Sequence, residues 1–423
     1  MRLWIDLTDL AAWRGPFTGI QQTVFNLASR YAGRDDVGFF IYDDVRRRFF
    51  SIDFPEVCRR LERPETGPRR GAVRAAQKVF DQLPPSVRSL VPPHASLRLR
   101  GLMEEALHLR PAAGAPVQMG PDAVVLLAGP TWHHRAMLPD LCRLKREAGF
   151  RLVAVMYDLV PIFYAHLFPD DLPRQYREHM VTLMSEASAL FAISRATQAD
   201  VQRFCADEGL PMPDTRVFRL GDTLAAVTPV APESPPEPGA FILTVGLEGR
   251  KNALLLYQMF KLAAQERIPL PRLVIAGRPS WIKQDHEALM RLLTRDPDAR
   301  DRIQVMTGLD DPRLTWLYQN CLFTMFPSLC EGWGLPVAES LRHGKLCLAS
   351  SASSIPEVGG DLAEYASPYD PRGFLDLVQR YLDPQRLAAR EAEIRARYRP
   401  HDWDAAFAGF DRTLRQTLGD QHY

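Results

Sequence analysis

Two glutamates eight positions apart enclose a glycine-containing turn, and this is where the sequence most clearly carries chemistry. The segment 326–341 reads FPSLCEGWGLPVAESL, with Glu331 at the start of the turn and Glu339 beyond it. The preceding apolar run predicts a buried strand, and Pro336 predicts the first turn of a helix. Gly334 allows a ligand to approach the backbone, and a helix start offers free N–H groups to an anion. The pattern therefore predicts a phosphate site flanked by two carboxylates.

Two simpler interpretations compete with this one. Two glutamates on a protein surface are common and need have no function. The turn also half-matches a dinucleotide-binding fingerprint, through Gly332, Gly334 and Val337. That fingerprint normally ends in a smaller residue and follows an early strand, whereas this turn lies deep in the second half of the chain.

Length and charge restrict the remaining possibilities. The chain has 423 residues, with 52 Lys and Arg against 51 Asp and Glu. Two domains are expected at this length, and near neutrality argues against a nucleic-acid partner.

No apolar stretch is long enough to span a membrane. Asp6 interrupts the N-terminal apolar residues, which predicts a first strand instead of a signal peptide and hence a cytoplasmic protein. The six cysteines are scattered, which predicts free thiols.

Short apolar runs alternate with helical patterns, which predicts an α/β fold with parallel sheets. The predicted strands are 124–128, 152–156, 190–193, 241–245, 273–276, 322–326 and 346–349. A helix is expected from Ala253, with Asn252 as its N-cap.

A proline-rich stretch divides the chain. Five prolines between Pro229 and Pro238 predict a linker, because proline donates no backbone hydrogen bond and stiffens the chain. We expect a first domain at 1–228, a linker at 229–239, a second domain at 240–400, and a final segment at 401–423. This final segment has apolar residues at helical spacing, which predicts an amphipathic helix that returns to the first domain.

The segment from about Arg59 to Arg100 is strongly basic. It holds ten Lys and Arg against three Asp and Glu, and it contains six prolines. A solvated loop is one interpretation. The other is a surface for anionic lipid or a phosphorylated acceptor, with a basic amphipathic helix at 73–83.

The glutamate pair, taken with other segments, resembles the retaining glycosyltransferases of family 4, which have the GT-B fold. It is most similar to the bacterial mannosyl- and rhamnosyltransferases of surface-polysaccharide assembly. The supporting segments are 18–21 (TGIQ), 155–161 (VMYDLVP), 191–194 (FAIS), 241–252 (FILTVGLEGRKN), 353–358 (SSIPEV) and 368–370 (PYD). The resemblance covers most of the chain outside about 46–116. It implies two Rossmann-like domains whose parallel sheets face each other across a cleft.

The resemblance implies a nucleotide diphosphate sugar as donor, bound mainly by the second domain. Glu331 would lie near the transferred sugar, and Glu339 would hold the ribose hydroxyls. A carboxylate suits a vicinal diol because both hydroxyls can donate to it. The other expected donor-binding residues are Arg250, Lys251, Gly334, Leu335, Gly246 and Gly19.

Cleavage of the sugar–phosphate bond leaves a new negative charge that either a metal ion or fixed cations can stabilise. Arg250 and Lys251 follow a predicted strand and suit this role. The Asp-x-Asp pairs at 296–298 and 402–404 match a metal motif by letters, but their positions indicate helix caps. We therefore expect neither a metal nor another cofactor. The family's reaction retains the anomeric configuration, commonly with the donor phosphate taking the acceptor's proton.

The chain departs from the family pattern at one important position. Many relatives carry His-Asp where this chain has Tyr157 and Asp158. Asp158 is the expected second catalytic residue, positioning the acceptor hydroxyl, although it could equally cap the next turn. Three histidines, His133, His134 and His166, are poor candidates to replace the missing one. The turn that contains Arg250 is also one residue shorter than the usual form in this family, which leaves the exact partner of Arg250 open.

The expected function is thus transfer of a hexose to a growing, lipid-linked glycan, with GDP-mannose as a guess for the donor. The expected place is the cytoplasm at the inner face of the plasma membrane, with the basic segment touching anionic lipid. One alternative is a sugar-nucleotide epimerase of similar fold. The other is a degenerate relative that binds or scaffolds without catalysis.

Overall fold

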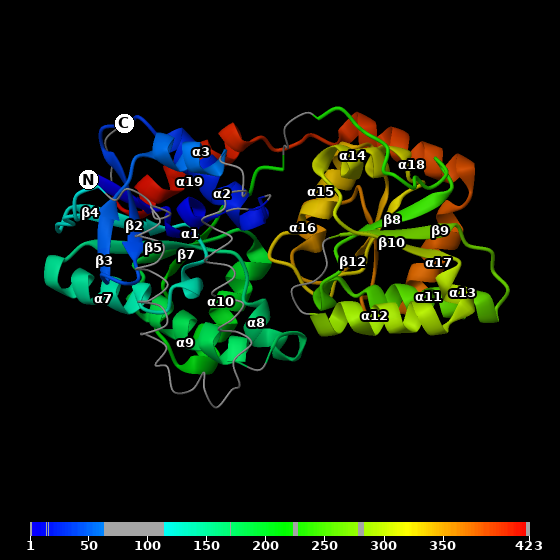
Figure 1. Cartoon of the computed structure of the whole chain (residues 1–423), viewed down its shortest axis with the longest axis horizontal. Coiled ribbons are helices and arrows are strands. Elements are labelled where there is room, and N and C mark those ends of the chain that lie inside the picture. Colours follow the sequence, from blue (N-terminus) through cyan, green and yellow to red (C-terminus); the bar gives the residue numbers. More distant parts are fainter. Residues whose placement is uncertain are drawn as a thin grey trace, which may run out of the picture.

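The computed structural model describes residues 2–13, 15, 17–62, 114–169, 171–222, 227–277 and 283–419. Two α/β domains lie side by side, each built on one sheet with helices on both faces (Figure 1). Most of the basic segment Arg59–Arg100, including the helix expected at 73–83, lies outside the described residues. At the start of this segment, Arg59 and Arg60 both form ion pairs with Glu56 on α3 (Phe54–Leu61).

Seven strands form the sheet of the first domain, in the order β3-β2-β1-β4-β5-β6-β7. Their bounds are β1 Arg2–Asp6, β2 Val37–Asp43, β3 Arg48–Ser51, β4 Ala123–Leu127, β5 Arg151–Met156, β6 Ala189–Ala192 and β7 Asp214–Val217. All neighbours are parallel except β2 and β3, which are antiparallel. The central strands are buried along nearly their whole length, as expected for a sheet covered by helices on both faces.

Six parallel strands form the sheet of the second domain, in the order β10-β9-β8-β11-β12-β13. Their bounds are β8 Phe241–Val245, β9 Arg272–Ala276, β10 Ile303–Met306, β11 Thr324–Phe326, β12 Cys347–Ser350 and β13 Glu364–Ala366. Strands β8 and β11 are neighbours, so the loops that follow them meet at one edge of the sheet.

Helices cover both sheets. In the first domain they are α1 Thr8–Ala12, α2 Gly19–Tyr31, α3, α7 Met137–Ala148, α8 Val160–Phe163, α9 Asp171–Glu186 and α10 Arg195–Glu208, with short 3-10 turns η1 Thr131–His133 and η2 Ala165–Leu167. The later helices belong to the second domain, except for α19, which returns to the first. They are η3 Gly249–Lys251, α11 Ala253–Gln265, α12 Lys283–Arg295, α13 Pro297–Arg300, α14 Asp311–Asn320, α15 Leu335–Arg342, α16 Ile355–Gly359, α17 Pro371–Tyr381, α18 Pro384–Arg397 and α19 Trp403–Thr417.

The α/β prediction is confirmed, and every apolar run that predicted a strand contains one. The sequence analysis did not predict the strands at the sheet edges (β3, β7, β10 and β13), and it did not predict β2. Edge strand β7 and edge strand β13 are short and half-exposed, so neither has a continuous apolar run. The expectation of purely parallel sheets is wrong at β3, because a tight turn after β2 returns the chain as a hairpin. The cysteines are free, as expected, although Cys58 is only half-buried.

Asn252 precedes α11, but it does not cap that helix with its side chain as predicted. Its backbone is left-handed, with φ 60°. Its amide instead donates to the carbonyl oxygens of Pro327 (3.1 Å) and Pro368 (2.8 Å). Asn252 therefore ties the turn after β8 to the loop after β11.

Helix α19 crosses back and lies against the first domain beside α2 (Figure 1). Phe410 is fully buried and packs edge-on against Phe191 of β6, with ring centroids 5.0 Å apart. Phe407 packs on Tyr31 at 4.8 Å, and Arg30 pairs with Asp404 at 2.8 Å. The last helix is thus part of the first domain's core, although the second domain precedes it in the chain.

The two crossings between the domains are bonded to each other. The Asp222 carboxylate accepts from the backbone N–H of His401 at 2.7 Å and from the Tyr398 hydroxyl at 3.1 Å. The Asp222 N–H donates to the His401 carbonyl at 2.9 Å. The proline-rich stretch forms no helix or strand between 227 and 240, and its ends bond to Pro312 and Asn320 of the second domain. The outgoing and returning chains therefore form one paired hinge.

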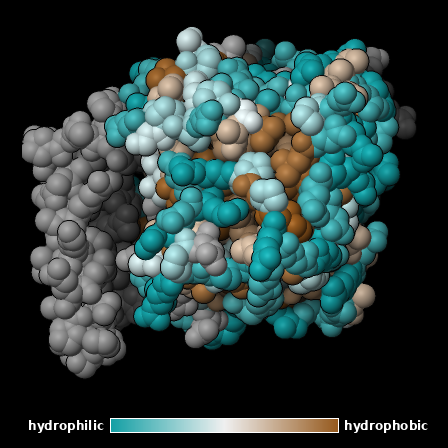
Figure 2. Space-filling model, turned by 90° about the vertical axis from the view of Figure 1, so that its right-hand side faces the viewer, coloured by the Kyte–Doolittle hydropathy of each residue, from teal (hydrophilic) through white to brown (hydrophobic). Residues whose placement is uncertain are grey.

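The end of the molecule formed by the second domain is mostly hydrophilic, with hydrophobic residues gathered in one area (Figure 2). In the described part of the chain, no helix is long and apolar enough to cross a membrane.

The packing of α19 predicts that Phe410→Ala destabilises the protein. The free energy of unfolding should fall by about 3–5 kcal/mol, because the variant loses a large buried ring that packs against Phe191 and Phe218. Urea denaturation measures this change. Arg412→Ala, on an exposed position of the same helix, is the control and should change stability by less than about 0.5 kcal/mol. A small effect of Phe410→Ala would mean that α19 is not part of the core.

Candidate active site between the two domains

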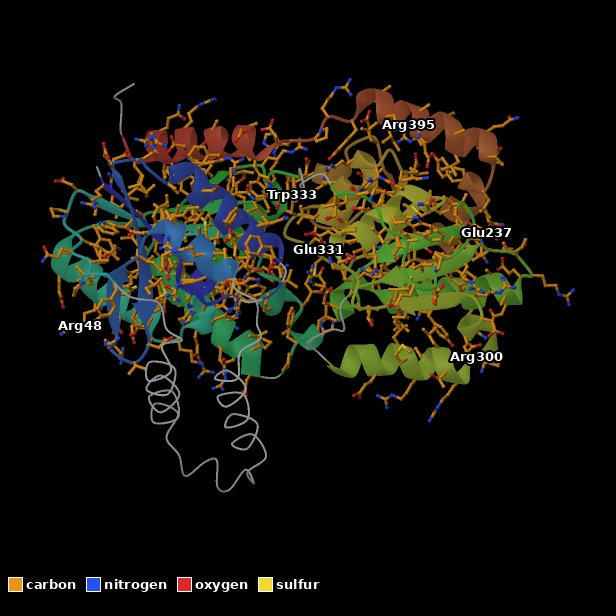
Figure 3. All side chains as sticks on the ribbon, turned by 45° about the horizontal axis from the view of Figure 1, so that its top comes forward. Arg48, Glu237, Arg300, Glu331, Trp333 and Arg395 are labelled. Carbon is orange, nitrogen blue, oxygen red and sulfur yellow. The ribbon has the colours of Figure 1, made fainter. Side chains whose placement is uncertain are left out.

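The loop between β11 and α15 brings the predicted glutamates to the side of the second domain that faces the first. Glu331 and Trp333 lie at this boundary, whereas Glu237 and Arg300 lie at the far end (Figure 3). Gly334 is the N-cap of α15 and has φ 118°, a conformation that favours glycine. Pro336 sits in the first turn, as predicted.

Two serines of the neighbouring loop fix this turn. The Ser353 hydroxyl donates to the Glu331 carbonyl at 2.6 Å, and the Ser354 hydroxyl lies 2.6 Å from the Trp333 carbonyl. Ser354 is fully buried. These contacts satisfy carbonyls of an irregular segment that would otherwise be buried without partners. The turn is therefore held rigidly from one side.

Glu331 forms a buried ion cluster with the two predicted cations. Its side chain is 7% exposed. Its Oε1 accepts from Lys251 Nζ at 2.7 Å, and its Oε2 pairs with Arg250 Nη1. Burial acts to raise the pKa of Glu331, but Arg250 and Lys251 outweigh it and hold that pKa below the ordinary value. Glu331 is therefore a carboxylate at neutral pH.

The strand–turn geometry explains why both cations reach this carboxylate. Gly246 directly follows β8 and has φ 109°, and a Cβ there would lie 2.7 Å from Lys251 Cγ. Only glycine leaves room for the Lys251 stem. Lys251 Nζ also lies 4.8 Å from the centroid of the Phe326 ring, which closes it off from the other side.

Glu339 lies on the first turns of α15, half-buried. Its Oε2 accepts from the Tyr318 hydroxyl of α14 at 2.6 Å. Burial raises the pKa of Glu339, while Tyr318 and the charge of Lys251 lower it. The influence of Lys251 connects this second carboxylate electrostatically to the ion cluster.

Asp158 meets the cluster from the first domain. It follows β5, and its Oδ1 accepts from Val160 N–H at 3.1 Å, so the turn-capping alternative is realised. Burial raises the pKa of Asp158, and the nearby Arg250 lowers it. The Tyr157 hydroxyl points elsewhere and donates to the Ala128 carbonyl at 2.7 Å inside the first domain. Of these two residues, Asp158 is the one that lies near the cluster.

Glycines allow the domains to touch here. A Cβ on Gly332 would lie 2.0 Å from the carbonyl oxygen of Tyr157 and 3.2 Å from Asp158 Cβ. A Cβ on Gly19, at the start of α2, would lie 3.3 Å from Leu335 Cδ1. The two predicted loops of the first domain thus face the turn and the start of α15.

The structure adds one bridge between the domains that the sequence did not predict. Glu357 of α16 accepts from the backbone N–H groups of Arg195 (2.9 Å) and Ala196 (2.8 Å) at the start of α10. A carboxylate suits this place because a helix N-terminus carries free donors and partial positive charge. The hydrogen bonds of Tyr318 and of the two serines were also not predicted, although the serines belong to the segment 353–358 on which the resemblance rests. In each case the signal is a contact between distant segments, which local spacing does not reveal.

The remaining candidates have other neighbours in the described part of the chain. His133 and His134 pair with Asp9 (3.4 Å) and Asp44 (2.8 Å), and His166 lies beside Tyr164. The first aspartate of each Asp-x-Asp pair has a partner within the protein. Asp402 accepts from Ala405 N–H at 2.7 Å and caps α19, as predicted. Asp296 accepts from the Tyr257 hydroxyl and pairs with Lys261 at 2.9 Å.

Part of the chain matches a known family, and longer stretches of it are similar to known proteins. Residues 231–397 match the family described as glycosyl transferases group 1. The chain is 28% identical over 254 residues to the serotype-specific mannosyltransferase WbdA of Escherichia coli, covering 56% of this chain and 30% of that protein. It is 25% identical to the O-antigen chain mannosyltransferase B of the same species, covering 52% and 58%. The chain spans about a third of the length of the WbdA proteins that it matches.

Solved structures show the same fold over the whole chain. Sucrose-phosphate synthase from Thermosynechococcus elongatus superposes with a TM-score of 0.61, at 16% identity, covering 99% of this chain and all of the other. HepE of Anabaena, in complex with UDP and glucose, superposes with a TM-score of 0.59, at 16% identity, covering 98% and 100%. The GT-B fold expected from the sequence is confirmed.

The contact at Gly332 predicts that Gly332→Ala disturbs the junction of the domains. The added methyl group cannot coexist with the Tyr157 carbonyl, so the loops must separate. We expect a melting temperature several degrees lower and a larger radius of gyration by small-angle X-ray scattering. Gly409→Ala is the control, because a Cβ there meets nothing within 4 Å. Unchanged melting and scattering for Gly332→Ala would contradict the described contact.

Proposed function

We propose that this chain, which has the GT-B fold and whose residues 231–397 match the family of group 1 glycosyl transferases, is a retaining hexosyltransferase. It moves a hexose from a nucleotide diphosphate sugar to a growing glycan. The observation that carries the proposal is the buried cluster of Arg250, Lys251 and Glu331 at the ends of β8 and β11.

The two cations are the proposed diphosphate site. Without a donor, Glu331 neutralises part of their charge, and Glu248 and Asp158 also lie close enough to raise the pKa of Arg250. A diphosphate carries more charge than one carboxylate and offers more oxygens to the guanidinium fork. Donor binding would therefore draw Arg250 and Lys251 from Glu331 to the phosphates. The released carboxylate could then accept hydrogen bonds from hydroxyls of the sugar.

Other residues complete the donor site in this proposal. Glu339 accepts from the ribose hydroxyls. Gly334 and Leu335 present the start of α15 to the diphosphate, where backbone N–H groups and the helix dipole favour an anion. Gly246 gives Lys251 its room, and Gly19 lets the first domain approach Leu335.

Asp158 is the proposed contact to the acceptor. It lies at the carboxyl end of β5, where the first domain meets the cluster. In this position it can accept a hydrogen bond from the attacking hydroxyl and orient it. The acceptor attacks from the side of the leaving group, and the donor phosphate takes its proton, so the anomeric configuration is retained. Fixed cations stabilise the departing diphosphate in place of a metal ion.

The names of the relatives support mannose as the sugar and an O-antigen-type polysaccharide as the acceptor. GDP-mannose as the donor and a lipid carrier for the acceptor are further parts of the proposal. A lipid-linked acceptor would place the protein in the cytoplasm at the inner face of the plasma membrane. Contact with anionic lipid through Arg59–Arg100 belongs to the same proposal.

A screen of nucleotide sugars tests the activity. We expect one donor, GDP-mannose first, to stabilise the protein thermally and to be consumed only with a glycan acceptor. NMR of the product should show the anomeric configuration of the donor, and EDTA should leave the rate unchanged. Isomerisation of the sugar without any acceptor would favour an epimerase, and binding without turnover would favour a scaffold. Either result would contradict the proposal.

Lys251→Ala should weaken donor binding at least tenfold, because it removes one of two cations from the proposed diphosphate site. Calorimetric titration with GDP and UDP measures the affinity. Lys261→Ala is the matched control, since this lysine of α11 pairs with Asp296 away from the site. Equal nucleotide affinity in Lys251→Ala and Lys261→Ala would contradict the assignment of Lys251 to the diphosphate site.

A further inference from the structure

Tyr318 is buried beside the site, and its hydroxyl forms a hydrogen bond with Glu339. It lies on α14, is 2% exposed, and packs with Phe241, Leu243 and Leu317. Its hydroxyl donates to Glu339 Oε2 at 2.6 Å, a short bond of the charge-assisted kind. Phenylalanine would fill the same apolar space, so packing alone does not explain a tyrosine here.

The ring of Tyr318 is held on its other face by a histidine. His343, just after α15, stacks on it with ring centroids 5.2 Å apart and planes 16° apart. Burial lowers the pKa of His343 to about 4, so the stacked imidazole is neutral at physiological pH. The Tyr318 hydroxyl thus has one fixed position, and it fixes one oxygen of Glu339.

The other carboxylate oxygen, Oε1, has no hydrogen-bond partner among the described residues of the chain. It keeps both lone pairs, and two lone pairs on one oxygen match the two donors of a vicinal diol. We propose that Tyr318 is a positioning residue that orients Glu339 toward the ribose diol of the donor and so makes the site selective for ribonucleotides. This inference rests on the proposed function.

The charge state of Glu339 agrees with this role. The charged and titratable groups that influence it are Tyr318 and Asp311 of α14, Lys251 of η3 and Arg342 of α15. Burial raises the pKa of Glu339, and the Tyr318 hydrogen bond opposes this by stabilising the carboxylate. Loss of the hydroxyl would raise that pKa further. The carboxylate would then be lost at a higher pH.

Tyr318→Phe tests the proposal, with Tyr381→Phe as its matched control. The Tyr381 hydroxyl donates to Glu364 at 2.8 Å in the same domain but outside the site. Affinities for GDP, UDP and their 2′-deoxy forms are measured by calorimetry. We expect the wild type to bind the better ribonucleotide at least fivefold more tightly than its deoxy form. Tyr318→Phe should reduce this ratio toward one, and Tyr381→Phe should keep it.

The pH dependence gives a second measurement that a purely structural role would not change. Ribonucleotide affinity should fall on the acid side, and Tyr318→Phe should move this fall to higher pH. The KM for the donor should rise in the variant with little change in kcat. If the wild type binds neither GDP nor UDP, the proposed function itself fails. If it discriminates against deoxyribose and Tyr318→Phe does so equally, only the role of Tyr318 is overturned.

Discussion

A carboxylate buried between two cations is the interaction on which the rest of this structure depends. Glu331 is 7% exposed and would be costly to bury alone, so Arg250 and Lys251 must reach it from another strand. Gly246 leaves room for Lys251, the pairing of β8 with β11 brings the two loops together, and Asn252 joins those loops. Removing one partner of such a pair commonly costs about 3–5 kcal/mol, because the other charge stays buried.

The same cluster organises the junction of the domains. The turn that holds Glu331 also places Gly332 against the backbone of Tyr157, and the serines that fix the turn precede α16. From α16, Glu357 reaches the start of α10 in the first domain. The two segments that connect the domains are bonded to each other at Asp222 and His401. A donor that rearranges the cluster would therefore act on the contacts that keep the domains together.

Sequence reasoning reached much of the fold, because buried parallel strands carry continuous apolar runs. It failed at β7 and β13, which are half-exposed and lack a continuous apolar run. It also missed β2, although residues 39–42 of that strand form a buried apolar run. For the site, spacing and residue type brought together Arg250, Lys251 and Glu331, which the structure joins in one cluster. Spacing could not find Tyr318 or Glu357, since each acts on a partner that is distant in sequence or in another domain. Asn252 shows a related limit: its residue type suits a helix cap, but tertiary contacts use its amide differently.

The central claim is that Glu331 occupies the two cations until a diphosphate replaces it. The most direct test is the affinity of Glu331→Gln for GDP and UDP, measured by calorimetry beside the wild type. Glutamine preserves the shape of the side chain and removes the competing negative charge. The account predicts that nucleotide affinity stays the same or increases, while transfer of the sugar is lost. A folded Glu331→Gln protein that binds both nucleotides tenfold more weakly would contradict it, because Glu331 would then be part of the nucleotide site instead of its competitor.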